Sequence, residues 1–282
     1  MLKLRVITAL VLFPFAVYGI LFLSNDYFAA LTGFIILLGA YEWAGFAKFP
    51  SVLSKLAYVV IVGTIIFSIW LVNFLLPLSV LNTLASAFWV YALILVLGFP
   101  ASARFWTNKS LIIAVMGIFL LSITWYALIS IHAIESLKFA QISITGPYLV
   151  FSVMMLIWAA DTGAYFSGKR FGKNKLAPKI SPGKSIEGVY GGLALAIIIT
   201  CLFAIWAGAG VQDYLHIIGL TAIVVIFSIV GDLTESMFKR QADIKDSGHI
   251  LPGHGGILDR IDGVTAAAPV FCIVLSWLYP LT

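Results

Sequence analysis

Charged residues are scarce in this chain of 282 residues, where Asp, Glu, Lys and Arg make up 10% and hydrophobic residues 62%. Soluble domains typically have about 25% charged and about 45–50% apolar residues, so an ordinary soluble fold is excluded. Cysteine is also rare, because Cys201 and Cys272 are the only two and both lie within apolar runs. Without a CxxC spacing or a Cys cluster, a disulfide framework and a redox motif are excluded as well.

Long apolar runs dominate the chain instead. A helix needs about 20 apolar residues to cross a bilayer. Nine runs come close to this length, at residues 6–23, 28–47, 56–76, 79–98, 111–131, 149–166, 188–208, 214–232 and 263–280. We therefore predict an all-α, polytopic integral membrane protein with about nine transmembrane helices.

Two of these runs allow a second interpretation. The first run follows Lys3 and Arg5, as the core of a signal peptide does. It is longer than such a core and a second run follows at once, so we expect it to remain in the mature protein. The short join near Pro77 also allows the third and fourth runs to form one long broken hairpin.

Basic residues indicate the orientation. If the N-terminus is cytoplasmic, 16 of the 17 Lys and Arg residues lie in cytoplasmic segments, and only Lys138 lies outside. This asymmetry predicts a cytoplasmic N-terminus and an external C-terminus. As a separate expectation, the membrane is the cell membrane of a bacterium, its inner membrane. The asymmetry also explains the net charge of +5 through contacts with membrane lipids, so no nucleic-acid partner is expected.

Acidic residues divide the chain into two halves. Residues 1–140 contain only Asp26, Glu42 and Glu135 as acids, and we interpret their five spans as a scaffold that contacts lipids or a second copy. Glu42 lies near the cytoplasmic end of its run, where a snorkelling or packing role is expected. Residues 141–282 hold four spans and two polar cytoplasmic loops, 167–187 and 233–262, and form the predicted catalytic part.

Three carboxylates converge at the cytoplasmic face of this second half. The predicted topology places Asp161, Asp232 and Asp259 there on three different spans, and an acid at such a depth is functional by default. If the eighth span continues as a helix, Ser236 and Lys239 share the face of Asp232. Carboxylates beside Lys and Arg are typical of a Mg²⁺–phosphate site, since Mg²⁺ uses one or two carboxylates together with substrate phosphates.

Two segments could bind anions. Ser181–Ser185 opens the seventh span, where free backbone N–H groups and Lys184 can meet a phosphate, and this start equally fits ordinary helix capping. It is not a Walker A loop, because residue 178 is Pro where the first Gly is required. The turn-rich segment 252–256 could form a nest of N–H groups. A membrane enzyme that joins a soluble phosphate donor to a lipid fits these features.

The segment from Ser236 to Asp262, SMFKRQADIKDSGHILPGHGGILDRID, resembles the signature of the phosphatidate cytidylyltransferases, also called CDP-diacylglycerol synthases. Asp161–Tyr165, Gly168–Gly172 and Ile180–Lys184 followed by Glu187–Gly188 resemble that family as well. The similarity is strong over residues 155–265 and only general over the first five spans. Ser185 departs from the pattern, where Thr is expected more often, but the hydroxyl is retained.

The resemblance implies that CTP and phosphatidate are converted to CDP-diacylglycerol and pyrophosphate with Mg²⁺, and allows a second cation and a homodimer. Metal ligands are expected at Asp232 and Asp259, with Asp262 and Asp161 as further ligands or as groups that orient them. Catalytic roles are expected for Asp232, Asp259, Asp262, Lys239 and Lys245. Substrate contacts are expected from Lys169, Arg170, Lys173, Ser181, Lys184, Ser185, Glu187, Ser236, Arg240, Asp246, His254, Gly255, Gly256 and Arg260.

Two other functions remain open at this point. Another metal-dependent transferase acting on lipid phosphates would also use cytoplasmic Asp clusters, although no DDxxD run occurs here. An ion-coupled transporter would place polar residues through the depth of the membrane and often has an internal repeat. The polar residues of this chain gather at one face instead, which favours the transferase.

Overall fold

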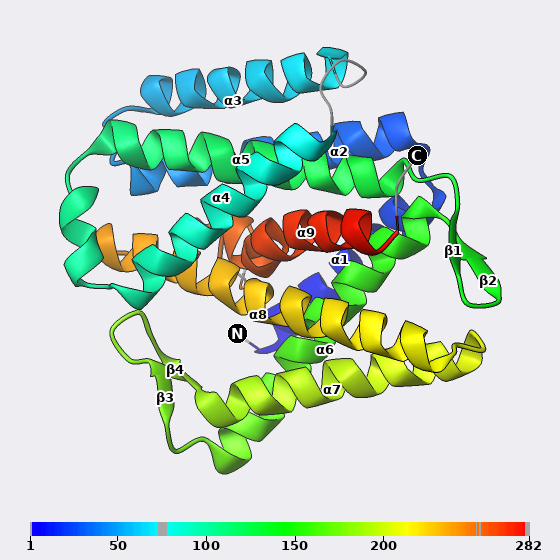
Figure 1. Ribbon diagram of the computed structural model, residues 1–282. Helices are drawn as coiled ribbons and strands as arrows, with labels where there is room; N and C mark the ends of the chain where they lie inside the picture. Colours follow the sequence, from blue (N-terminus) through cyan, green and yellow to red (C-terminus); the bar gives the residue numbers. More distant parts are fainter. Residues whose placement is uncertain (1, 73–77, 252, 254, 280–282) are drawn as a thin grey trace.

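The computed structural model describes residues 2–72, 78–251, 253 and 255–279. Within these residues it contains nine α-helices, each matching one predicted apolar run (Figure 1): α1 (Leu2–Phe22), α2 (Asn25–Phe46), α3 (Val52–Val72), α4 (Leu78–Leu97), α5 (Ser110–His132), α6 (Gly146–Phe171), α7 (Ile186–Trp206), α8 (Val211–Gln241) and α9 (Leu258–Leu278). The predicted join near Pro77 and the predicted substrate residue His254 lie outside the described residues.

The chain is an all-α, polytopic membrane protein. Seven of the described helices are long and apolar enough to cross a membrane by length and composition. Large side chains such as Leu53, Leu97 and Leu111 are 77% exposed on the helix surfaces, as expected where lipid replaces water. The count of nine spans and the sidedness of the termini stay predictions.

Short elements that the sequence did not indicate join the helices. A 3₁₀ helix, η1 (Ala101–Phe105), precedes α5, and two antiparallel hairpins follow, β1 (Leu137–Phe139) with β2 (Ile142–Ile144) and β3 (Lys175–Ala177) with β4 (Ser181–Ser185). The hairpins lie at opposite ends of the bundle (Figure 1). The predicted boundary between residues 140 and 141 falls in the turn between β1 and β2, and that division stays a prediction.

The helices extend further into the polar loops than predicted. Helix α8 continues to Gln241, and α9 begins at Leu258, so the predicted loop 233–262 is reduced to residues 242–257. The predicted loop 167–187 contains the end of α6 and the β3–β4 hairpin. The extension of α8 is rich in residues with high helix propensity, which explains why its polarity did not end the helix.

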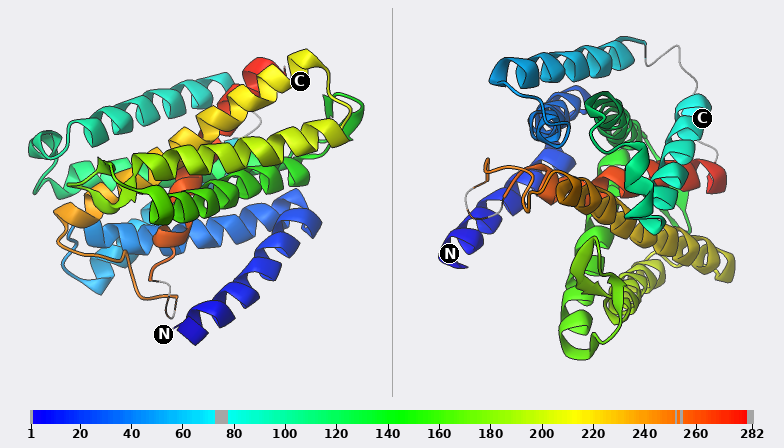
Figure 2. Two further views of the ribbon diagram at one scale, coloured as in Figure 1. Left: turned by 90° about the horizontal axis from the view of Figure 1, so that it is seen from below. Right: turned by 90° about the vertical axis from the view of Figure 1, so that its left-hand side faces the viewer.

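Helix α9 is the centre of the bundle and contacts α2, α4, α5, α6 and α8 (Figure 1). It is buried continuously from Gly263 to Leu275. Helix α1 lies at the edge, at an angle to the other helices (Figure 2). Glycines set the closest approaches: a Cβ on Gly231 of α8 would collide with the carbonyl oxygen of Asp262, and one on Gly163 of α6 with that of Gly191 on α7. The four helices α6 to α9 therefore pack closely where the predicted acids lie.

Candidate active site

Asp232 on α8 connects two elements of the site. The Ser236 hydroxyl, one turn further along α8, donates a hydrogen bond to Asp232 Oδ1 at 3.2 Å. Lys184 of β4 forms an ion pair with Asp232 Oδ2 at 2.5 Å, and these two side chains are 27% and 31% exposed. Ser236 therefore shares the helix face of Asp232 as expected, whereas Lys239 pairs with other acids, and the hairpin supplies a cation that a phosphate could reach.

Two further carboxylates approach Asp232 from neighbouring helices. Asp161 on α6 and Asp262 on α9 both interact electrostatically with Asp232 and with Lys184. Asp161 is exposed, and Asp262 is half-buried and accepts a hydrogen bond from the backbone N–H of Gly263. The structure thus brings three of the four predicted metal ligands to one end of the bundle.

The fourth, Asp259, lies in a second polar cluster around Lys239. The ammonium group of Lys239 is 2.6 Å from Asp259 Oδ1 and 3.2 Å from Glu235 Oε1. The three side chains are only 12%, 9% and 4% exposed, in that order. Glu235 Oε2 is buried without a hydrogen-bond partner among the described residues. A cation held between two carboxylates satisfies the requirement that buried charges be paired.

The second oxygen of Asp259 organises the loop before α9. Asp259 Oδ2 accepts hydrogen bonds from the Ser247 N–H at 2.9 Å, the Ser247 hydroxyl at 3.0 Å and the Gly256 N–H at 2.8 Å. Gly255 has φ of +84°, and a Cβ there would approach Asp259. Only glycine adopts this conformation without strain. Gly255 and Gly256 therefore fold the loop around a carboxylate, and both oxygens of Asp259 are used by protein donors.

Glu42 on α2 is joined to the same loop from the other half of the chain. It is 4% exposed, and its Oε1 accepts the Ile257 N–H at 3.0 Å. Its Oε2 accepts the Leu258 N–H at 2.9 Å and lies 3.0 Å from the Ser247 hydroxyl, whose single proton it shares with Asp259 Oδ2. A carboxylate at a helix N-terminus satisfies free N–H groups and complements the helix dipole. The expectation that Glu42 snorkels to the interface is wrong, because the side chain caps α9 from inside the protein.

The β3–β4 hairpin is held by several predicted substrate residues. Glu187 accepts hydrogen bonds from the N–H and the side-chain amide of Asn174, the latter at 2.8 Å. The Ser185 hydroxyl accepts the Gly188 N–H at 3.1 Å and so caps α7. Arg240 Nε donates to the carbonyl oxygen of Ile180 at 2.9 Å. These contacts position Lys184, and the predicted substrate contacts of the same residues remain predictions.

Other predicted residues lie further out on the same face of the bundle. Lys169 and Arg170 end α6 and are exposed, as is Lys173 in the turn that follows. Lys245 and Asp246 are exposed in the loop 242–257, and Ser181 lies at the start of β4. Arg260 is exposed on α9 and interacts electrostatically with Asp161. Arg260 is thereby tied to the Asp232 cluster through Asp161, and the substrate contacts of these seven residues stay predictions.

The donor set fits Mg²⁺ only together with a substrate. Within the described part of the chain, no three Asp, Glu, His or Cys side chains lie close enough to hold a metal alone. Mg²⁺ commonly uses one or two carboxylates and takes its other ligands from phosphates and water. Asp232 with Asp262 or Asp161 matches that use, because these acids lie together and Asp232 is partly exposed.

Comparison with known proteins decides the family. The model of the cytidylyltransferase family matches residues 3–278 of this chain. The chain belongs to this family. It is 44% identical over 275 residues to the phosphatidate cytidylyltransferase of Pseudomonas aeruginosa, which covers 98% of this chain and 97% of that protein. The enzyme of the same name from Haemophilus influenzae is 40% identical over 286 residues, or 96% of this chain and 97% of the relative.

A third relative matches a smaller part. The phosphatidate cytidylyltransferase of Bacillus subtilis is 43% identical over 127 residues, 45% of this chain and 47% of that enzyme. The resemblance found in the sequence is thereby confirmed at the level of the family.

Three polar residues of this cytidylyltransferase family member were missed or misjudged from the sequence. Glu235 lies four residues before Lys239, a spacing that places an acid and a base on one helix face and could have indicated the pair. Ser247 and Glu42 gave no such signal. Ser247 is an unremarked loop serine, and Glu42 lies 205 residues away from it in the chain.

Proposed function

We propose that this protein transfers the cytidylyl group of CTP to phosphatidate, which yields CDP-diacylglycerol and pyrophosphate at the cytoplasmic face of the membrane. The observation that carries the proposal is the 44% identity, over 98% of the chain, to a phosphatidate cytidylyltransferase. The polar cluster supports it, because three carboxylates and Lys184 lie at one end of apolar helices. A lipid phosphate and a soluble nucleotide can meet at that level.

The reaction needs little help with proton transfer. A phosphate monoester already carries about −1.5 to −2 charges near neutral pH, so an oxygen of the phosphatidate can attack the α-phosphorus of CTP directly. The new P–O bond forms in line with the bond to the β-phosphate, which breaks, and pyrophosphate leaves with its electron pair. The barrier lies in bringing two polyanions together, and Lys184 beside Asp232 offers a positive charge to one of them.

We propose Mg²⁺, alone or with a second cation, as the cofactor. Asp232 and Asp262, with Asp161, are the residues that would hold it, and Asp259 is kept as a candidate although its oxygens bind Lys239, Ser247 and Gly256. When bound, Mg²⁺ neutralises phosphate charge and aligns the attacking and leaving oxygens. Lys239 is held rigidly by Glu235 and Asp259 and is proposed to stabilise the leaving pyrophosphate from its buried position.

The setting follows from the same features. We propose a bacterial inner membrane, with the N-terminus and the polar loops in the cytoplasm, and a homodimer as the working unit. The exposed basic residues Lys169, Arg170 and Lys173 would then face the anionic headgroups and attract the lipid substrate.

A turnover assay tests the proposal. The purified full chain in detergent is given CTP, phosphatidate and Mg²⁺, and pyrophosphate and CDP-lipid are measured with and without chelator. We expect both products in equal amounts, only with phosphatidate present, and none after chelation. Consumption of only a preformed CDP-lipid or a nucleotide sugar would instead identify another lipid transferase, and ion uptake by liposomes without CTP turnover would identify a transporter.

A further inference from the structure

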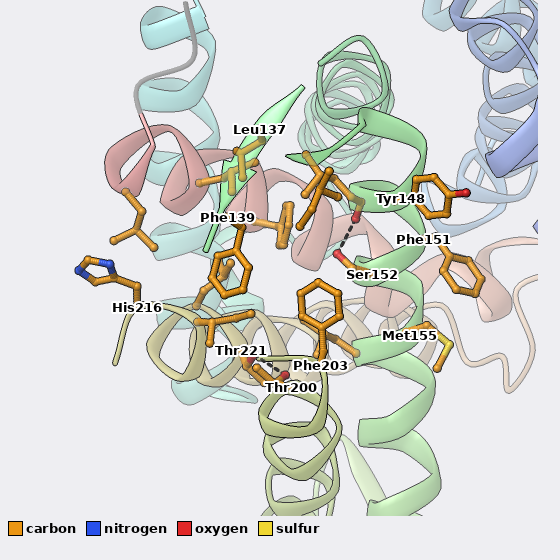
Figure 3. A pocket seen from close by; sticks show the side chains of 18 of the residues that line it. Leu137, Phe139, Tyr148, Phe151, Ser152, Met155, Thr200, Phe203, His216 and Thr221 are labelled. Carbon is orange, nitrogen blue, oxygen red and sulfur yellow. Dashed lines mark hydrogen bonds between the residues drawn. The ribbon is translucent and has the colours of Figure 1, made fainter. Parts of the chain in front are cut away.

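An apolar cavity of about 370 Å³ lies between α6, α7, α8, α9 and the β1–β2 hairpin (Figure 3). Aromatic side chains, among them Phe139, Phe151, Phe203 and Phe271, and Met155 line it. Small-molecule pockets typically measure about 300–1,000 Å³, so the cavity is large enough for a ligand. Leu137, Phe139 and Ile144 of the β1–β2 hairpin line it, whereas Lys184, the partner of Asp232, belongs to the β3–β4 hairpin at the opposite end of the bundle (Figure 1).

The polar groups of the cavity are largely satisfied within the protein. The hydroxyls of Thr200 and Thr221 hydrogen bond to each other at 2.9 Å. The Ser152 hydroxyl donates to the carbonyl oxygen of Leu149 at 2.7 Å. The His216 ring projects away from the other lining side chains (Figure 3). An occupant would therefore meet a hydrocarbon surface, which suits an aliphatic chain better than a polar molecule.

The depth of the cavity matches the reach of a lipid bound at the active site. The lining residues of α8 lie between His216 and Thr221, which are 16 and 11 residues before Asp232, or about 24 and 16 Å of helix. Those of α9 lie between Phe271 and Leu278, which are 9 and 16 residues after Asp262, or about 14 and 24 Å. The hydrocarbon core is about 30 Å thick within about 40–45 Å overall, so a lipid chain ends about 20 Å from its headgroup. A lipid whose phosphate is near Asp232 would have its chain ends at this depth.

We propose that the cavity binds the methyl-terminal part of an acyl chain of the phosphatidate substrate and so sets its chain-length preference. The inference rests on the proposed function. The helices α6, α8 and α9 that carry the three acids, together with α7, which follows Lys184, also form the cavity. One bundle therefore holds the phosphate at the Asp232 cluster and the chain end about 20 Å further along the same helices.

Two opposite substitutions test the inference. Ser152→Phe places a ring in the cavity, whereas Phe203→Ala enlarges the cavity. Leu202→Phe is the matched control, because Leu202 is 61% exposed on α7 and is not among the residues that line the cavity. The assay compares kcat/KM for distearoyl and dilauroyl phosphatidate in mixed micelles of the full chain. We expect Ser152→Phe to lower the long-to-short ratio about tenfold, Phe203→Ala to raise it, and the control to leave it unchanged.

A binding measurement separates the possible occupants. A phosphatidate with a diazirine at the methyl end of one chain should label peptides that contain Ser152 and Phe203, and unlabelled phosphatidate should compete. If phosphatidylcholine competed equally well, the cavity would be filled by any membrane lipid. If the long-to-short ratio of kcat/KM were unchanged in both variants, the cavity would not set chain-length preference. Either result overturns the inference. If the unsubstituted chain releases no pyrophosphate from any phosphatidate, the proposed function fails instead, and the labelling still reports what the cavity binds.

Discussion

The carboxylate of Glu42 offers the sharpest test of how the two halves of the chain cooperate. It accepts hydrogen bonds from the Ile257 N–H, the Leu258 N–H and the Ser247 hydroxyl, all from the segment that carries Asp259 and Asp262. In Glu42→Gln the side chain keeps its shape but exchanges one acceptor oxygen for an NH₂ donor. Ser247 can turn its hydroxyl to accept from that group, whereas a backbone N–H cannot.

At least one buried N–H is therefore left without an acceptor, which costs about 1–3 kcal/mol. This free energy falls on the start of α9 and the Ser247 turn, because the hydrogen bonds of Glu42 go to Ser247, Ile257 and Leu258. Since Ser247 also binds Asp259, the change should displace the Lys239 pair. We expect kcat to fall about 10–100-fold, as when an orienting partner of a site is removed, with a much smaller change in KM for CTP.

Hydrogen exchange and kinetics together check this prediction. The amides of Ile257 and Leu258 should lose protection in Glu42→Gln, while those of the central part of α9 keep it. Glu135→Gln is the matched control, since it makes the same chemical change at an exposed position near the β1–β2 hairpin. Turnover near that of the unsubstituted chain, with both amides still protected, would refute the reasoning.

Three further outcomes follow from the site. Asp232→Asn should abolish turnover or raise the Mg²⁺ concentration at half-maximal rate at least tenfold, whereas Asp259→Asn should lower kcat at an unchanged Mg²⁺ requirement. Mg²⁺ titrations of both variants check this prediction. An equal shift of the Mg²⁺ requirement in both variants would contradict it. Lys184→Met should raise KM for phosphatidate or CTP by removing the cation that faces Asp232, with Lys184→Arg recovering part of the loss. Gly255→Ala should destabilise the loop by about 1–2 kcal/mol, the usual cost of a left-handed residue with a side chain. Hydrogen exchange of the Gly256 amide should then become faster, and an unchanged exchange rate would count against this prediction.

Much of the architecture could be predicted from the sequence, because the membrane leaves the chain few choices. Each long apolar run matches one helix of the described residues. The i, i+4 spacing placed Ser236 beside Asp232 correctly. Spacing rules act along one helix only, however. They could not show that α2 packs against the loop before α9, so the contact of Glu42 with Leu258, 216 residues away, had no signal. The extension of α8 to Gln241 could be stated only as a condition, because the polarity of residues 233–241 equally fits the end of a span.

The acids of the site fall into two classes by what their oxygens already bind. Glu42 and Asp259 accept hydrogen bonds from backbone N–H groups of one loop and are largely consumed by folding it. Asp232, which is partly exposed, binds two side-chain groups, the Ser236 hydroxyl and the Lys184 ammonium, which a ligand could displace. Asp161 is exposed and has Lys184 as a nearby cation. Asp259 of the first class and Asp161 of the second both lie in family-like motifs, so a motif alone does not separate the classes. The separation arises because a membrane enzyme must fix its polar loop against apolar helices, where water cannot satisfy the backbone. One set of carboxylates does this, and only then can a second set be held in place for the phosphates.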